Sequence, residues 1–174
     1  MHILLGFLAV VGVAVAWIWR ARNAASAAKE VVEVADDVRA AVRRFGYRRI
    51  ADKNPLDTVE DPRLSAAGIL AAIAKMDGDY TREQMTAIQQ ECGRVFSASD
   101  KDAEQFTAYG RWLAQQSANP DEVVRRLSGN LSKNLAANER QELLGMVERV
   151  SAIEGRGATD EQILALKRLR ESLG

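Results

Sequence analysis

Helix-start signals recur along residues 54–174 and leave little room for another kind of structure. Each signal is a residue that can cap a helix, followed at once by proline or, three positions later, by a Gln or Asp. No segment between them alternates apolar and polar residues as a half-buried strand would. The sequence therefore predicts an all-α bundle of about six helices. The signals are Asp61-Pro62, Thr81 with Gln84, Ser99 with Asp102, Asn119-Pro120, Asn138 with Gln141, and Thr159 with Gln162.

Apolar residues follow each start at steps of three and four, so each helix is expected to bury one face. We expect the first helix to end at Gly78. Its predicted inner face is Leu64, Ala67, Leu70, Ile73 and Met76; that of the second is Met85, Ile88, Cys92, Val95 and Phe96; that of the last is Ile163, Leu166, Leu169 and Leu173.

The chain contains two segments of similar sequence, a repeat that we call the internal echo. A shift of 77 positions aligns residues 69–78 with residues 146–155, so that Met76-Asp77-Gly78 matches Ile153-Glu154-Gly155. A capping box follows in both places, with one inserted residue in the second. The sequence predicts the same arrangement twice: a helix, an acidic residue, a glycine, a short turn and a capped helix.

Residues 3–19 form an uncharged apolar run of 17, near the lower limit for a helix that crosses a bilayer. Arg20 and Arg22 follow at once, so the positive-inside rule predicts an outside N terminus and a cytoplasmic domain. A cleaved signal peptide is the alternative, for which Ala25-Ser26-Ala27 offers a cleavage pattern. Because the start of the chain lacks the cations of a signal peptide, we expect an uncleaved transmembrane anchor over residues 1–22.

Residues 23–53 are expected to form an amphipathic juxtamembrane helix, ended by Gly46, and a linker. Read as heptads, its stripe offers a homo-oligomer contact through residues 24–45, but alanines fill one seam. We favour the alternative that this helix packs on its own domain or lies on the bilayer. In the second case its cations can meet anionic lipid; they are Arg39, Arg43, Arg44, Arg48, Arg49 and Lys53.

Composition restricts the chemistry of residues 54–174. The chain has one His and one Cys, which excludes multi-His metal sites, internal disulfides and histidine-based catalysis in the domain. Residues 54–174 carry 15 basic and 19 acidic side chains, so nucleic acid is not an expected partner. Cys92 lies on an apolar stripe, where a small buried hydrophobe is expected.

Acidic residues gather at the two echoed turns. Asp77, Asp79 and Glu83 alternate like the first ligands of a calcium loop, and Glu154 and Asp160 form a weaker counterpart. The calcium-loop pattern then fails, because a glycine and a bidentate Glu are missing from the required positions. The alternative role is structural, since acids near a helix N terminus favour its dipole. Oxygen ligands alone would select calcium or another hard divalent cation.

Three segments of residues 54–174 are similar to a known family: AIAKMDGDYTREQ, NPLDTVEDPRLSAAGIL and ERVSAIEGRGATDEQ. With them the chain resembles the TerB-like family, named for bacterial tellurite resistance and shared with the N-terminal region of membrane-anchored DnaJ-like co-chaperones. It implies an all-helical fold without an established reaction, metal binding through acidic residues, and a place in membrane-associated stress complexes. No His-Pro-Asp motif follows, so a direct Hsp70-stimulating role is not expected.

The residues and the resemblance together favour a binding module and not an enzyme. We expect a single-pass protein of the bacterial inner membrane that contacts the lipid bilayer and recruits cytoplasmic or membrane stress-response proteins. Trp112 is a candidate anchor for a partner. The alternatives are a structural, oligomerising membrane protein without a metal role and, least favoured, an acid-dependent hydrolase.

Overall fold

Helix α2, Pro62–Ala74, lies at the centre of the fold. The computed structural model describes residues 54–78, 80–153 and 157–174, and gives only the backbone of Asp77. Eleven consecutive residues of α2, from Leu64 to Ala74, are buried. The sequence predicted a single buried face, which was too narrow: a helix that is apolar on all sides is buried on all sides.

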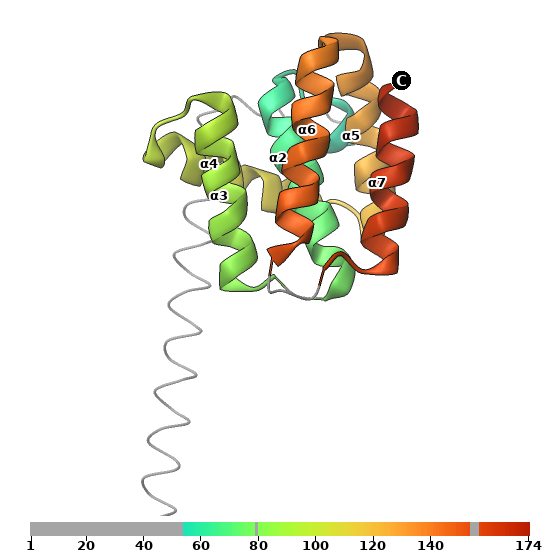
Figure 1. Cartoon of the computed structure of the whole chain (residues 1–174). Helices are drawn as coiled ribbons and strands as arrows, with labels where there is room; N and C mark the ends of the chain where they lie inside the picture. Colours follow the sequence, from blue (N-terminus) through green and yellow to red (C-terminus); the bar gives the residue numbers. More distant parts are fainter. Residues whose placement is uncertain (1–53, 79, 154–156) are drawn as a thin grey trace, which may run out of the picture. The chain divides into compact units, whose positions relative to one another are not determined.

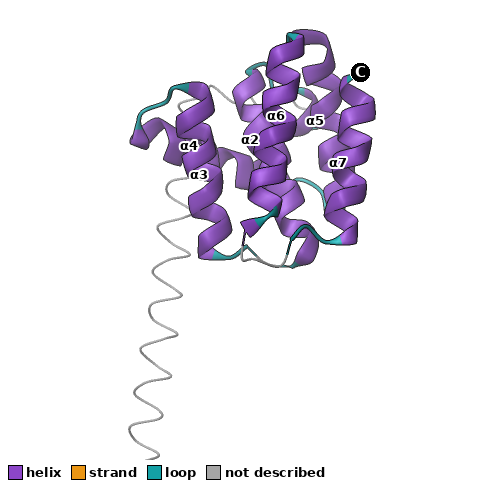
Figure 2. Cartoon of the chain, in the orientation of Figure 1, coloured by secondary structure: helices purple, strands orange, loops and turns teal. Residues whose placement is uncertain are grey.

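Five further α-helices surround α2 and form a compact all-α bundle. Figure 1 shows α3 and α4 on one side of α2 and α6, with α5 and α7 on the other. Figure 2 shows only helices and loops in the described residues. The prediction of an all-α fold of six helices is confirmed for this part of the chain. The bounds are α3 Arg82–Phe96, α4 Asp100–Ala114, α5 Pro120–Asn134, α6 Ala137–Ser151 and α7 Asp160–Leu173.

Small residues let the neighbouring helices approach α2 closely. A side-chain carbon on Gly110 of α4 would lie 2.5 Å from the carbonyl oxygen of Ala67 on α2. One on Gly68 of α2 would lie 2.6 Å from a methyl group of Leu127 on α5. The contact between α2 and α4 therefore depends on a glycine, because backbone atoms occupy the space that any side chain would need.

Most of the predicted helix starts are confirmed. Asp61, Ser99 and Asn119 cap α2, α4 and α5 through their side-chain oxygens. Thr81 and Thr159 begin α3 and α7 with complete capping boxes. Both echoed segments thus lead into a capped helix, and Gly78 ends the first with a positive φ of 129°.

The start predicted at Asn138 was wrong, because α6 begins at Ala137 and Ala136 is its N-cap. Ala136 has no side-chain oxygen, so only half of a capping box forms: Glu139 accepts a hydrogen bond from the Ala136 N–H at 2.7 Å. The carboxylate of Glu139, which binds the Ala136 N–H, therefore sets the position of this N-cap, and no Asn side chain does.

A short 3-10 helix, η1, covers Pro55–Asp57 just before α2. Leu56 is fully buried, and its carbonyl oxygen accepts a hydrogen bond from Asn130 of α5 at 3.2 Å. Asp57 forms an ion pair with Arg126 of α5 at 2.7 Å. These contacts hold the chain that enters α2 against the bundle. A second 3-10 helix, η2, covers Lys75–Asp77 after α2.

No helix within the described ranges is both long enough and apolar enough to cross a membrane. The predicted anchor over residues 1–22, the amphipathic helix and its oligomer contact over residues 24–45, and the basic cluster lie outside the described residues. Those predictions stay predictions.

Candidate functional site

A buried glutamine joins the start of α7 to the end of α2. Gln162 is 2% exposed, and its side-chain nitrogen donates a hydrogen bond to the carbonyl oxygen of Ile73 at 3.2 Å. Its side-chain oxygen accepts from the Thr159 N–H at 3.1 Å, which completes the capping box of α7. One side chain therefore caps α7 and fixes its first turn beside the end of α2.

This bond brings the flanks of the two predicted acidic turns to one end of the bundle, which we call the turn end. It comprises the described residues at the ends of α2 and α6 and at the starts of α3 and α7. Figure 1 shows these four helix ends at the bottom of the view. The sequence repeat did not predict that the two turns lie at the same end of the bundle. A tertiary hydrogen bond holds their flanks there.

The structure describes the side chains of two of the five candidate metal ligands, Glu83 and Asp160. Glu83 and Asp160 are exposed in the first turns of α3 and α7, where carboxylates favour the helix dipole. Asp79 and Glu154 lie outside the described residues, and only the backbone of Asp77 is described. Among the described residues no three His, Cys, Asp or Glu side chains come together as a metal site would require.

Tyr80 lies in the first turn and packs against a cation from α4. The guanidinium carbon of Arg111 is 5.4 Å from the centre of the Tyr80 ring, a cation–π distance. Burial raises the pKa of Tyr80 to about 12, although the Arg111 charge opposes this rise. In the described part of the chain the buried Tyr80 hydroxyl and Arg111 Nε have no hydrogen-bond partner. The first turn thus packs its aromatic ring against a positive charge from α4.

Trp112 is half-buried and packs against the hydrophobic core. Its ring centre is 5.2 Å from that of Tyr109, which is itself 3% exposed. Part of the indole therefore belongs to the core, and only the remainder is accessible to a partner. A substitution of Trp112 would disturb packing as well as any surface role.

Cys92 is fully buried in α3. Burial raises the pKa of its thiol to about 12, and the nearby Glu91 charge adds to this rise. A thiol with such a pKa is scarcely ionised at neutral pH and is a poor nucleophile. The residue behaves as the small buried hydrophobe that its position predicted.

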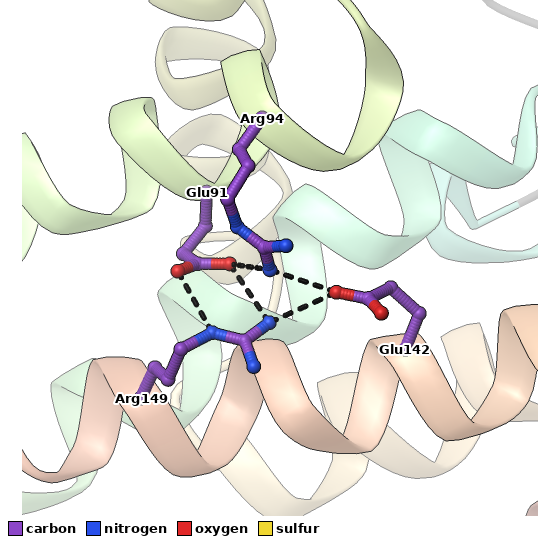
Figure 3. Close-up of polar contacts among 4 residues, drawn as sticks. All are labelled: Glu91, Arg94, Glu142 and Arg149. Carbon is purple, nitrogen blue, oxygen red and sulfur yellow. Dashed lines mark hydrogen bonds and ion pairs between the residues drawn. The ribbon is translucent and has the colours of Figure 1, made fainter.

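A charged cluster that was not predicted joins α3 to α6 (Figure 3). Arg149 of α6 donates hydrogen bonds to both carboxylate oxygens of Glu91, at 2.9 and 3.0 Å. Arg94 bridges Glu91 and Glu142 at 2.7 Å each. Burial raises the pKa of Glu91, but hydrogen bonds from Arg149 and Arg94 outweigh it and lower that pKa overall. Two arginines balance the charge of the two acids, so the cluster links α3 to α6 through ion pairs.

A pocket of about 430 Å³ lies between α5 and α7. Its carboxylates already have cationic partners: Asp121 pairs with Arg168 at 3.0 Å, and Glu122 pairs with Arg126 at 2.9 Å. The lining combines both signs of charge with the apolar Val124 and Leu169, so it favours no single class of ligand. The residues are Asn119, Asp121, Glu122, Val124, Arg125, Ser128, Arg168, Leu169 and Ser172.

Comparison of the chain with protein-family models, with curated proteins and with solved structures finds no match. The resemblance to the TerB-like family therefore rests on the three segments quoted in the sequence analysis.

Proposed function

We propose that this chain is a membrane-tethered, cytoplasmic binding module of the TerB-like kind, which recruits stress-response proteins through its turn end. The observation that carries the proposal is the hydrogen bond from Gln162 to Ile73. A bond between the start of one echoed helix and the end of another supports the view that the two acidic turns act as one surface. The setting we propose is the tellurite or envelope-stress response.

A buried Cys92 supports binding rather than catalysis, because its raised pKa makes the thiol a poor nucleophile. Exposed acids at two helix starts instead suit an electrostatically matched partner. A hard divalent cation bound by Asp77, Asp79 and Glu83, with Glu154 and Asp160 as weaker candidates, remains part of the proposal.

The experiment compares charge reversals at the turn end with reversals elsewhere. Tagged full-length chain is cross-linked in cells, and the co-purified proteins are quantified by mass spectrometry. Asp79→Lys with Glu83→Lys should reduce recovery of the specific partners severalfold, because like charges then face the partner's cations. Glu60→Lys with Glu104→Lys is the matched control, since both residues are exposed and belong to neither turn.

Equal recovery with the turn-end and control variants would contradict recruitment through this surface. Circular dichroism of both variants checks that helical content is kept.

The membrane tether has its own test. A reporter that is active only outside the cytoplasm, fused after Gly174, should give no signal, because Arg20 and Arg22 follow the apolar run on the predicted inner side. The same reporter fused before Met1 serves as the positive control. A strong signal from the Gly174 fusion would contradict the orientation.

A further inference from the structure

Helix α7 exposes two adjacent large hydrophobic residues near its start. Ile163 is 55% exposed and Leu164 is 46% exposed, and they are the exposed large hydrophobics of the described residues. Ile163 was predicted to face the core, and that prediction was wrong. The inward positions belong to Gln162, Ala165, Leu169 and Leu173, because the hydrogen bond of Gln162 sets the rotation of the helix.

Charged residues flank Leu164 symmetrically on the exposed face of α7. Asp160 precedes Leu164 by four positions and Arg168 follows it by four. Glu161 precedes it by three and Lys167 follows it by three. Residues three and four apart share a helix face, so these five form one stripe, opposite the buried side. Its order is acidic, apolar, basic.

Such a stripe is complementary to a second copy of itself that runs in the opposite direction. If a second α7 lies antiparallel with its Leu164 against this Leu164, Asp160 lies beside Lys167 and Glu161 beside Arg168 of the other copy, because each of these pairs lies on one side of Leu164. Twofold symmetry then forms each ion pair twice and covers both leucines, as an interface between identical surfaces requires. We propose that α7 is the contact for a second copy of this chain. This inference does not depend on the proposed recruitment function.

The charges of the stripe are available for such a contact. In the part of the chain that the structure describes, no ion pair engages Asp160, Glu161 or Lys167. Arg168 pairs with Asp121 at 3.0 Å, but the two side chains are 54% and 47% exposed. A guanidinium has five donors, so Arg168 can keep this surface pair and bind a second carboxylate.

A second copy fits this face better than an unrelated protein does, because an unrelated partner would need no equal spacing on the two sides of Leu164. The oligomer contact predicted at residues 24–45 is a different one, since its heptad pattern would suit a parallel pair of helices. The two arrangements are separable. On an antiparallel α7 pair the two copies of Leu164 are adjacent, whereas the two copies of Glu171 are displaced by fourteen residues, about 21 Å along the helix.

The first test uses a short, membrane-permeable thiol cross-linker on cells that express the full chain. Leu164→Cys should give a cross-linked dimer, while the control Glu171→Cys should not, although both positions are exposed. The unmodified chain gives the background, because Cys92 is buried. Equal cross-linking at both positions indicates a parallel pair, and none above background indicates no pair; either result would overturn the proposal.

The second test exchanges the charges in the Leu164→Cys chain. Glu161→Lys alone and Arg168→Glu alone should each reduce the dimer severalfold, because twofold symmetry places two like-charged pairs at the contact. The double variant Glu161→Lys with Arg168→Glu should restore the dimer. A double variant as weak as the single variants, or single variants as strong as the parent, would contradict the antiparallel contact. Both residues are exposed, and circular dichroism verifies folding.

Discussion

Gln162 and Ile73 are 89 positions apart in the sequence and are joined by a hydrogen bond of 3.2 Å between a side-chain amide and a backbone carbonyl. Gln84 holds the equivalent place in α3 and makes the same capping bond to Thr81, at 3.1 Å. The two glutamines therefore share a local role, and the bond to Ile73 distinguishes Gln162.

This pair gives a prediction on stability. Gln162→Ala should lower the free energy of unfolding by about 1–2.5 kcal/mol, because it removes both the capping interaction and a buried hydrogen bond to the Ile73 carbonyl. Gln84→Ala should lower it by less, about 0.5–1 kcal/mol, since it loses only the capping interaction. Urea denaturation of the full chain measures both. Equal losses would show that the bond to Ile73 contributes nothing.

A change of glycine to alanine should have opposite effects on stability at Gly110 and at Gly129. Gly110→Ala should destabilise the fold by about 1–3 kcal/mol, because its new methyl group would meet the backbone of Ala67. Gly129→Ala, in the exposed part of α5 with no atom within 4 Å of the added carbon, should stabilise by about 0.5–1 kcal/mol. Thermal unfolding followed by circular dichroism measures the shifts. A tolerated Gly110→Ala would contradict the close approach of α2 and α4.

The charged cluster predicts a pH dependence. The pKa of Glu91 is lowered from 4.5 in the folded chain, so the unfolded chain binds more protons as the pH falls. The stability contributed by Glu91 is therefore complete above about pH 4.5 and is lost as the pH falls through the lower folded pKa. At pH 7 Glu91→Gln should cost about 1–2 kcal/mol, and the difference from the parent should shrink toward pH 3.

A matched control for Glu91 is the exposed pair of Glu148 and Arg170, at 3.2 Å. Glu148→Gln should change stability by less than about 0.5 kcal/mol, as exposed ion pairs usually do. If Glu91→Gln were as neutral as Glu148→Gln at pH 7, the cluster would not fasten α3 to α6.

The divalent-cation part of the proposal is tested by melting. If the first turn binds calcium, a hundredfold excess over the dissociation constant should stabilise the full chain by about 2.7 kcal/mol. Asp77→Asn with Asp79→Asn should abolish that gain, while Glu60→Gln with Glu104→Gln should keep it. A melting temperature unaffected by millimolar calcium, magnesium and manganese would exclude the cation and leave the recruitment proposal standing.

Helix starts were predictable because capping is local. A Thr with a Gln three positions later satisfies backbone N–H groups within one turn, whatever the rest of the fold does. The wrong prediction of a helix start at Asn138 has a local cause as well. The carboxylate of Glu139 binds the N–H of Ala136, which becomes the N-cap although it has no side-chain oxygen. The uniform burial of α2 was readable in principle from a segment without a polar face, SAAGILAAIA.

Tertiary relationships were not predictable from the same signals. The rotation of α7, which exposes Ile163, follows from a hydrogen bond to a distant carbonyl. The ion pairs between Glu91 and Arg149 join residues 58 apart. Only the pairing of Glu91 with Arg94, three positions apart, had a local signal. The turn end was thus visible as two separate turns, and their association required the packed structure.

The central claim is that the two turns act as one binding surface because Gln162 fixes the start of α7 beside α2. The most direct measurement is quantitative partner recovery from cells expressing Gln162→Ala, with Gln84→Ala as control, at a temperature where circular dichroism shows both chains folded. We predict a severalfold loss of partners with Gln162→Ala and near-parental recovery with Gln84→Ala. Equal recovery from the two variants would contradict the claim.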